Sequence, residues 1–478
     1  MANRVIRVRS VGGGVGERLL HRGIAAIQAE QHVTPGFPAE VVAAAEKAAR
    51  RPRLPELDRT DLPLVTVDPP GSMDLDQAMH LARDGDGFVV HYAIADLAAF
   101  ISPGDPLDLE AHRRGESLYG ADSLVPLHPR ELSEGAASLL PDQERPSFLW
   151  TIRLAADGAV TDARVERARV RSRERLDYEG LQRSGGELFD LLEEIGRLRI
   201  GQEEARGGVS LPMPEQQVEV EDGVARLEFR EVLPVEEWNA QISLLTGFAA
   251  ARLMVAAKVG ILRTLPPPED RVVQRLRRTA RGLGVDWSPD VDYPEFIRGL
   301  DSAKPQEAAM VVACTALLRG AGYAGFDGSV PEQPEHAALA APYAHVTAPL
   351  RRLVDRYGLE CCAAICAGEP VPEWVRSRLG ELPGTMQESG RRAHAYENAV
   401  LDLVEAQTLH GRVGDAFRGV VVELDGEERT RGEVVVRDPA VEARATTDRP
   451  GGLPLGEEVV LTLAEADPAT RTVRFHYH

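Results

Sequence analysis

The chain has 478 residues, of which 43% are hydrophobic and 27% charged, so it is long enough for several domains and is not disordered or fibrous. No apolar run reaches the roughly 18 residues of a membrane span, and the start MANRVIRVRSVGGGVGERLL lacks the core of a secretion signal. We therefore expect a cytoplasmic protein with no membrane partner. The net charge of −20 excludes a uniformly basic surface. Nearly all basic residues are arginines, however, and arginine suits phosphate binding, so the net charge does not exclude a nucleic-acid partner.

Residues 1–58 predict a short, mostly helical unit. Apolar residues recur at helical spacing in GERLLHRGIAAIQAEQH (16–32) and in PAEVVAAAEKAARR (38–51). The proline-rich and charged stretch RPRLPELDRTDLP (51–63) then predicts a linker.

Strands are expected from about residue 60 to 175, and helices from about 185 to 410. The strand candidates are LPLVTVD (62–68), GFVVHYAIAD (87–96) and SFLWTIRLAADGAVTDARVERARV (147–170), the last with a hairpin turn at ADG. The helix candidates are ELFDLLEEIGRLRIGQEEAR (187–206), EEWNAQISLLTGFAAARLMVAAKVG (236–260) and QEAAMVVACTALLRG (306–320). Strands followed by helices predict an α+β domain.

The last 65 or so residues predict a small separate barrel. The five short strand candidates are DAFRGVVVELD, RGEVVVRD, AVEARATT, EEVVLTLAEAD and TRTVRFHYH. Five strands of this length fit an OB-type barrel, a common platform for single-stranded nucleic acid. The alternative is a β module without a ligand.

The stretch TVDPPGSMDLDQA (66–78) predicts a cation site. Asp68 would end a strand, Pro-Pro-Gly forms a turn, and Asp74 and Asp76 point to one side if the chain is extended there. Converging carboxylates repel one another unless a cation neutralises them, and an all-oxygen set suits Mg²⁺ or Mn²⁺. A solvated turn is the alternative, whereas the spacing of a calcium loop is absent.

This stretch resembles the signature of the RNB family, the ribonuclease II and ribonuclease R type of 3′-to-5′ exoribonuclease. Further stretches resemble the family in the same order, over roughly 60–410: YAIADLAAFISPGDPLDLEAHRRGESLYGADSLVPLHPRELSEGAASLLPDQERPSF (92–148), ERLDYEGL (174–181), VEEWNAQIS (235–243), YAHVTAPLRR (343–352) and RRAHAYEN (391–398).

The resemblance implies metal binding by Asp68, Asp74 and Asp76, with Asp74 and Asp76 also catalytic. Where the family has a fourth acid, this chain has Gln77. An amide can still offer its oxygen to Mg²⁺ or hold a metal-bound water, but it brings no charge, so the departure bears on a second metal.

Arg351 matches a family arginine near the scissile phosphate, where it would stabilise developing charge. The resemblance also implies substrate-binding residues, which are Arg352 for backbone phosphate, Tyr119 and Tyr178 for bases, and Glu236 or Glu237 and Glu397 along the RNA path. The alternatives are a core tyrosine for Tyr178 and a helix-surface acid for each glutamate.

Three domains follow, namely a helical unit at 1–58, an RNB catalytic domain at 59–410 and an S1-like domain at 411–478. Ribonuclease II relatives usually carry two cold-shock barrels first, which 58 residues cannot encode, so we expect the helical unit to be a winged-helix or helix-turn-helix module. The implied function is a monomeric, metal-dependent 3′-to-5′ exoribonuclease that releases nucleoside 5′-monophosphates from single-stranded RNA with a free 3′ end, or from structured RNA with a 3′ overhang. The alternative is a catalytically weakened RNB-type RNA-binding protein.

Overall fold

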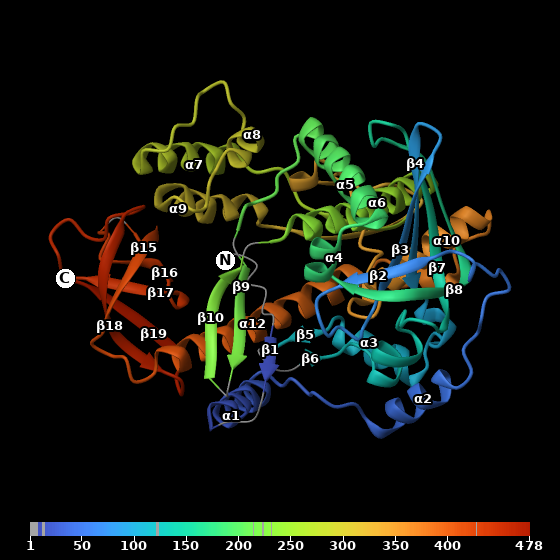
Figure 1. Cartoon of the computed structure of the whole chain (residues 1–478), viewed down its shortest axis with the longest axis horizontal. Coiled ribbons are helices and arrows are strands. Elements are labelled where there is room, and N and C mark those ends of the chain that lie inside the picture. The colour runs from blue at the N-terminus through green and yellow to red at the C-terminus, as the bar shows by residue number, and fades with distance from the viewer. Residues whose placement is uncertain are drawn as a thin grey trace.

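Two closed five-stranded barrels organise the fold, and Figure 1 shows them at opposite ends of the molecule. The computed structural model describes residues 8–11, 15–120, 124–213, 215–221, 224–230, 232–426 and 428–478. The α+β class, the C-terminal barrel and the helical N-terminal region are confirmed.

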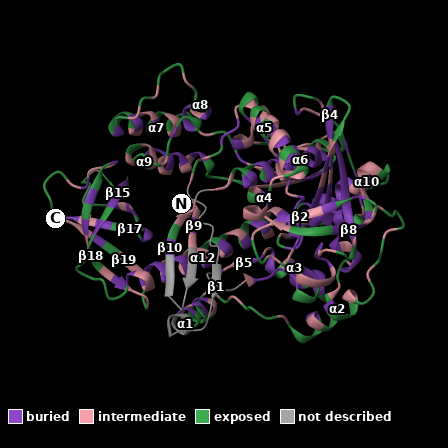
Figure 2. Ribbon diagram, viewed as in Figure 1, coloured by how far each residue is buried: buried purple, intermediate pink, exposed green. Residues whose placement is uncertain are grey.

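The first barrel contains the predicted strands. Its hydrogen-bonded order is β2 (Leu64–Asp68), β3 (Gln77–Asp84), β4 (Gly87–Ala95), β7 (Glu144–Leu154) and β8 (Val160–Asp177). All neighbours are antiparallel except β2 and β8, which run parallel and close the barrel. Large side chains such as Tyr92 and Trp150 are fully buried, so side chains and not solvent fill this part of the fold. Figure 2 shows much of the ribbon of these strands in the colour of buried residues.

Helices cover this barrel and share one apolar cluster with it. They include α5 (Glu187–Arg206), which has the expected bounds, α6 (Pro234–Ala257) and α10 (Leu353–Ala367). The helices α5 and α6 approach closely, because a Cβ on Gly196 would lie 2.5 Å from the Cβ of Trp238. By length and composition α6 could cross a membrane, contrary to our expectation of no such run, but half of its most apolar window is buried inside the protein.

The two N-terminal helices do not pack on each other as one module. Helix α1 (Val15–Glu30) lies on the long helix α12 (Leu382–Leu409), and α2 (Ala39–Ala49) lies on α3 (Pro106–Arg114). They belong to different apolar clusters. This arrangement differs from the compact winged-helix or helix-turn-helix unit that we expected, because each amphipathic face finds its partner elsewhere in the chain.

Several short strands interrupt the region expected to be helical. A hairpin of β9 (Glu215–Glu221) and β10 (Val224–Arg230) takes β1 (Val8–Val11) as a third, parallel strand. The remaining elements of this region are β11 (Val259–Thr264), α7 (Asp270–Leu283), α8 (Tyr293–Arg298), α9 (Pro305–Cys314), β12 (Gly322–Asp327), β13 (Glu335–His336), β14 (Ala341–Pro342) and α11 (Glu373–Arg376). Before it lie the short strands β5 (Leu118–Tyr119) and β6 (Leu124–Val125) and the helix α4 (Tyr178–Ser184).

The C-terminal barrel contains the five strands expected from the sequence. They are β15 (Ala416–Leu424), β16 (Arg431–Arg437), β17 (Ala440–Thr447), β18 (Glu458–Asp467) and β19 (Thr472–Tyr477). The parallel pairing of β17 with β19 closes the barrel. Its outer residues Val420 and Val422 join an apolar cluster with α7, α8 and α9, so barrel and helices pack as one unit.

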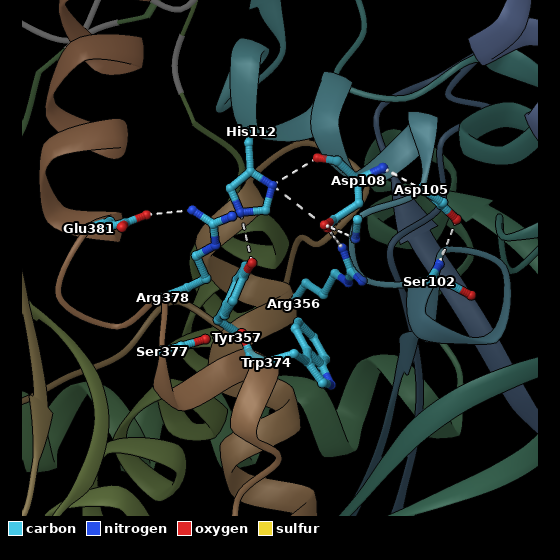
Figure 3. Close-up of polar contacts among 11 residues, drawn as sticks. Ser102, Asp105, Asp108, His112, Arg356, Tyr357, Trp374, Ser377, Arg378 and Glu381 are labelled. Carbon is cyan, nitrogen blue, oxygen red and sulfur yellow. Dashed lines mark hydrogen bonds and ion pairs between the residues drawn. The ribbon is translucent and has the colours of Figure 1, made fainter.

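A buried polar network joins α3 to α10 (Figure 3). The Arg356 Nη1 donates to Asp108 Oδ1 at 2.5 Å, and the side chain of Arg356 is only 2% exposed. One turn along α3, His112 contacts the Asp108 carbonyl through Nδ1 (2.8 Å) and the Tyr357 hydroxyl through Nε2 (2.8 Å). The network fixes α10, which begins directly after Arg351 and Arg352.

We expect Asp108→Asn to lower the free energy of unfolding by about 3–5 kcal/mol, because it leaves the buried Arg356 charge unpaired. Chemical denaturation measures the loss. Arg83→Gln is the matched control, since Arg83 and Glu194 form an exposed ion pair that contributes at most about 1 kcal/mol. Equal, small losses in both variants would contradict the structural role of the network.

Candidate active site

Three aspartates gather where the chain crosses from β2 to β3. Asp68 ends β2 and pairs in register with Asp177 at the end of β8. A turn follows, in which the Ser72 N–H donates to the Pro69 carbonyl and Gly71 has a φ of +84°. Such a turn favours proline early and requires a residue that tolerates positive φ, as glycine does. It returns the chain so that, in addition to burial, the charge of Asp74 raises the pKa of both Asp68 and Asp76.

Neighbouring segments hold this acidic turn in place. The Ser138 hydroxyl accepts from the Leu75 N–H (3.0 Å) and donates to the Met73 carbonyl (2.6 Å). Arg175 on β8 donates to the Ser72 carbonyl at 3.1 Å. Other arginines of the basic run 167–175 are likewise engaged within the protein, including Arg167 with Asp96 and Glu360. This run therefore supports the barrel and does not form an open basic groove.

The carboxylates lie in a desolvated environment. Burial raises the pKa of Asp68 to about 7, raises that of Asp74, and raises that of Asp76 well above its usual range, while Arg351 opposes each shift. One buried and two half-buried acids with one nearby arginine are a donor set that suits a hard divalent cation. As placed, no group of three His, Cys, Asp or Glu side chains within the described ranges is close enough to hold a metal ion.

Arg351 reaches the acids from a distant part of the sequence. Its Nε lies 3.5 Å from Asp76 Oδ2, and the neighbouring Leu350 N–H donates to Asp76 Oδ1 at 2.8 Å. The side chain of Arg351 remains 43% exposed and is hydrogen-bonded to the phenol of Tyr119. The structure therefore brings together Asp76, Arg351 and Tyr119, as the sequence predicted.

Gln77 lies beside these acids, and both polar ends of its amide are engaged. Its Nε2 donates to the Thr347 carbonyl at 2.5 Å, and its Oε1 accepts from the Tyr92 hydroxyl at 2.9 Å. Gln77 thus links β3 to the loop 347–352 that carries Arg351. Its role as a metal ligand stays a prediction, and an aspartate could not make the same link, because it is shorter and has no N–H donor.

Asp355 is a site residue that the sequence analysis missed. Its buried carboxylate accepts from the Ala348 N–H at 2.7 Å and forms a two-point contact with Arg352 (2.8 Å and 2.8 Å). Arg352, predicted to bind phosphate, is therefore bound within the protein. The spacing of Arg352 and Asp355 across the first turn of α10 was the available signal.

The other predicted residues lie in different surroundings. Glu397 accepts from the Tyr119 backbone N–H, and burial raises the pKa of Glu397 to about 7. Tyr178 follows Asp177 and accepts from Asn239 Nδ2 at 3.1 Å. At the start of α6, Glu236 forms a two-point ion pair with Arg230, whereas Glu237 is exposed. Glu397 therefore supports Tyr119, and Glu236 fixes the start of α6.

Comparison with known families agrees with this geometry. The model of the RNB domain family matches residues 57–359, and that of the RNase II-type exonuclease C-terminal S1 domain matches residues 415–478. The chain belongs to the RNB family. Ribonuclease R of Escherichia coli (strain K12) is 27% identical over 418 residues, which are 81% of this chain and 51% of that protein. The chain thus spans about half the length of this RNB relative.

Solved structures share the RNB fold. The apo form of Mycoplasma genitalium RNase R superposes with a TM-score of 0.84 at 19% identity, covering 96% of this chain and 78% of that one. The same protein has been solved with ribose methylated single-stranded RNA and with double-stranded RNA. Yeast Ssd1, described as a pseudonuclease, superposes with a TM-score of 0.67 at 15% identity, covering 96% and 58%.

We expect Gln77→Glu to lower the kcat of RNA hydrolysis about tenfold. A carboxylate cannot donate to the Thr347 carbonyl, and a buried polar group left without a partner costs about 1–3 kcal/mol. The half-saturating Mg²⁺ concentration should stay near the wild-type value. Tyr92→Phe keeps the Thr347 contact, so it should have the smaller effect.

If the missing fourth carboxylate instead limits hydrolysis or metal binding at the RNB site, Gln77→Glu or Gln77→Asp would raise kcat or lower the Mg²⁺ concentration that the enzyme requires. Metal-titrated hydrolysis assays on the variants distinguish the two accounts.

Proposed function

We propose that this chain is a metal-dependent 3′-to-5′ exoribonuclease that hydrolyses RNA to nucleoside 5′-monophosphates. The observation that carries the proposal is the contact of Arg351 with Asp76, beside Asp68 and Asp74, with the Arg351 side chain still 43% exposed. Carboxylates that can hold a divalent cation, next to an arginine, are the groups that phosphodiester hydrolysis needs. Membership of the RNB family, whose nucleases are generally metal-dependent, supports the same reading.

Each residue has a distinct role in this proposal. Asp68, Asp74 and Asp76 hold the cation, either Mg²⁺ or Mn²⁺, which when bound would polarise the phosphate and supply an activated water. Arg351 binds the scissile phosphate and stabilises charge that develops there. Tyr119, whose backbone is held by Glu397, positions the last nucleotide by stacking.

The proposed substrate is single-stranded RNA with a free 3′ end, or structured RNA with a 3′ overhang. The structures of Mycoplasma genitalium RNase R with single-stranded and double-stranded RNA support both forms. The C-terminal barrel matches an S1 family, which favours RNA over a small nucleotide as substrate. Cytoplasmic location and action as a monomer stay predictions.

The competing function is RNA binding without catalysis. The fold shared with the pseudonuclease Ssd1 and the neutral Gln77 motivate it. Arg351 nevertheless contacts Asp76 and also lowers the pKa of Asp68 and Asp74 through its charge, which favours hydrolysis.

End-labelled RNA tests the proposal, with products resolved by length in the presence and absence of Mg²⁺ or Mn²⁺. We expect mononucleotide release from the 3′ end only with metal, and we expect Asp76→Asn to reduce turnover at least about a hundredfold while RNA binding survives, because it removes a charge beside Arg351. Metal-independent binding with no release by the wild-type chain would favour the competing function. Wild-type turnover by a folded Asp76→Asn variant would contradict the assigned role of Asp76.

A further inference from the structure

A groove of about 470 Å³ lies between α7 and loops of the C-terminal barrel. One wall is α7, with Arg275, Arg278 and Gly282, and the other wall includes Arg429, Gly451 and Glu457. Three guanidinium groups face a single carboxylate in the described lining. Such a local excess of positive charge is unusual in a chain with a net charge of −20.

The groove arginines are available for a ligand. Arg275, Arg278 and Arg429 are exposed, and none of them forms an ion pair with a carboxylate in the part of the chain that the structure describes. By contrast, Arg277 on the same helix donates to the Val291 carbonyl (2.8 Å) and lies over the Trp287 ring. Arg275 and Arg278 are three residues apart and so share one face of α7.

The two walls of the groove are held at a fixed distance. A Cβ on Gly456 would lie 2.3 Å from Leu283 Cδ2, so the barrel loop packs directly on the end of α7. A Cβ on Gly452, whose φ is +75°, would lie 2.4 Å from the Cβ of Arg429, so this glycine allows Arg429 its position. Beside it, Gly451 has nothing within 4 Å of where its Cβ would be, which leaves the backbone open to a ligand.

We propose that this groove binds backbone phosphates of the RNA strand, upstream of the 3′ end that occupies the candidate active site. Arginine suits this role because its planar fork matches phosphate oxygens, and such contacts carry no sequence preference. The proposal rests on the proposed function, since it takes RNA as the substrate.

The groove lies far from the acidic turn. Figure 1 shows α7 and the C-terminal barrel at the end of the molecule opposite the first barrel. A short strand bound at the active site therefore does not reach the groove, whereas a long strand does. Chain length thus becomes the variable that separates the two sites.

The test compares Arg275→Gln/Arg278→Gln with the control Arg22→Gln/Arg252→Gln, which removes the same charge from exposed positions on α1 and α6. Fluorescence anisotropy, in EDTA so that no metal-dependent hydrolysis occurs, measures the Kd for RNA strands of roughly five and roughly thirty nucleotides. The longer strand exceeds the roughly 4–16 nucleotides that one OB fold covers. Salt titrations give the slope of log K against log salt. Hydrolysis of the short strand by the wild-type chain with Mg²⁺ tests the proposed function separately.

We expect the groove variant to bind the long strand about tenfold more weakly at roughly 0.1 M salt. Each phosphate contact of a single strand contributes about 0.7 to the slope of log K against log salt, so the loss of two arginines should make that slope about 1.4 smaller in magnitude. Binding and hydrolysis of the short strand should match the control. Unchanged binding of the long strand overturns the proposal; this is the result expected if the groove binds an acidic protein instead of RNA. Equal losses on short and long strands overturn it too.

Discussion

The structure of the site depends on the repulsion among three desolvated carboxylates at one end of the first barrel. Burial raises the pKa of Asp68, Asp74 and Asp76, and the charge of Asp74 raises that of Asp68 and Asp76 further, so the cluster holds its negative charge only with positive partners nearby. Arg351 is the cation that the chain itself supplies. Both the proposed metal and the proposed phosphate contact follow from this one electrostatic constraint.

The loop that delivers Arg351 is held at several points. Gln77 donates to the Thr347 carbonyl, and Ser243 contacts the Thr347 hydroxyl at 2.9 Å. The Leu350 N–H donates to Asp76, and the Ala348 N–H donates to Asp355. An arginine on a loop fixed in this way loses little conformational freedom when it binds a phosphate. The neutral Gln77 is then part of the loop's attachment, which gives the departure from the family pattern a physical reason.

The sequence predicted what local patterns encode. Runs of β-branched and aromatic residues identified the strands of the C-terminal barrel and those of the first barrel except β3. The turn TVDPPGSMDLDQA identified the acids, because these features depend on neighbours in the chain. The partners of Gln77 could not be predicted, since Thr347 lies 270 residues away. The same holds for Glu236, which Arg230 engages from a hairpin in a region expected to be helical, and for α1, whose partner is α12. Periodicity shows that a face is apolar but not what it packs against.

The most direct test of the central claim is anomalous diffraction from crystals grown with Mn²⁺ and an RNA whose terminal phosphodiester resists hydrolysis. The account predicts Mn²⁺ bound by Asp68, Asp74 and Asp76, a phosphate against Arg351, and the Gln77 amide still on the Thr347 carbonyl. Bound RNA with no Mn²⁺ at the three aspartates would contradict it, as would a Gln77 amide that has left Thr347 to coordinate the metal.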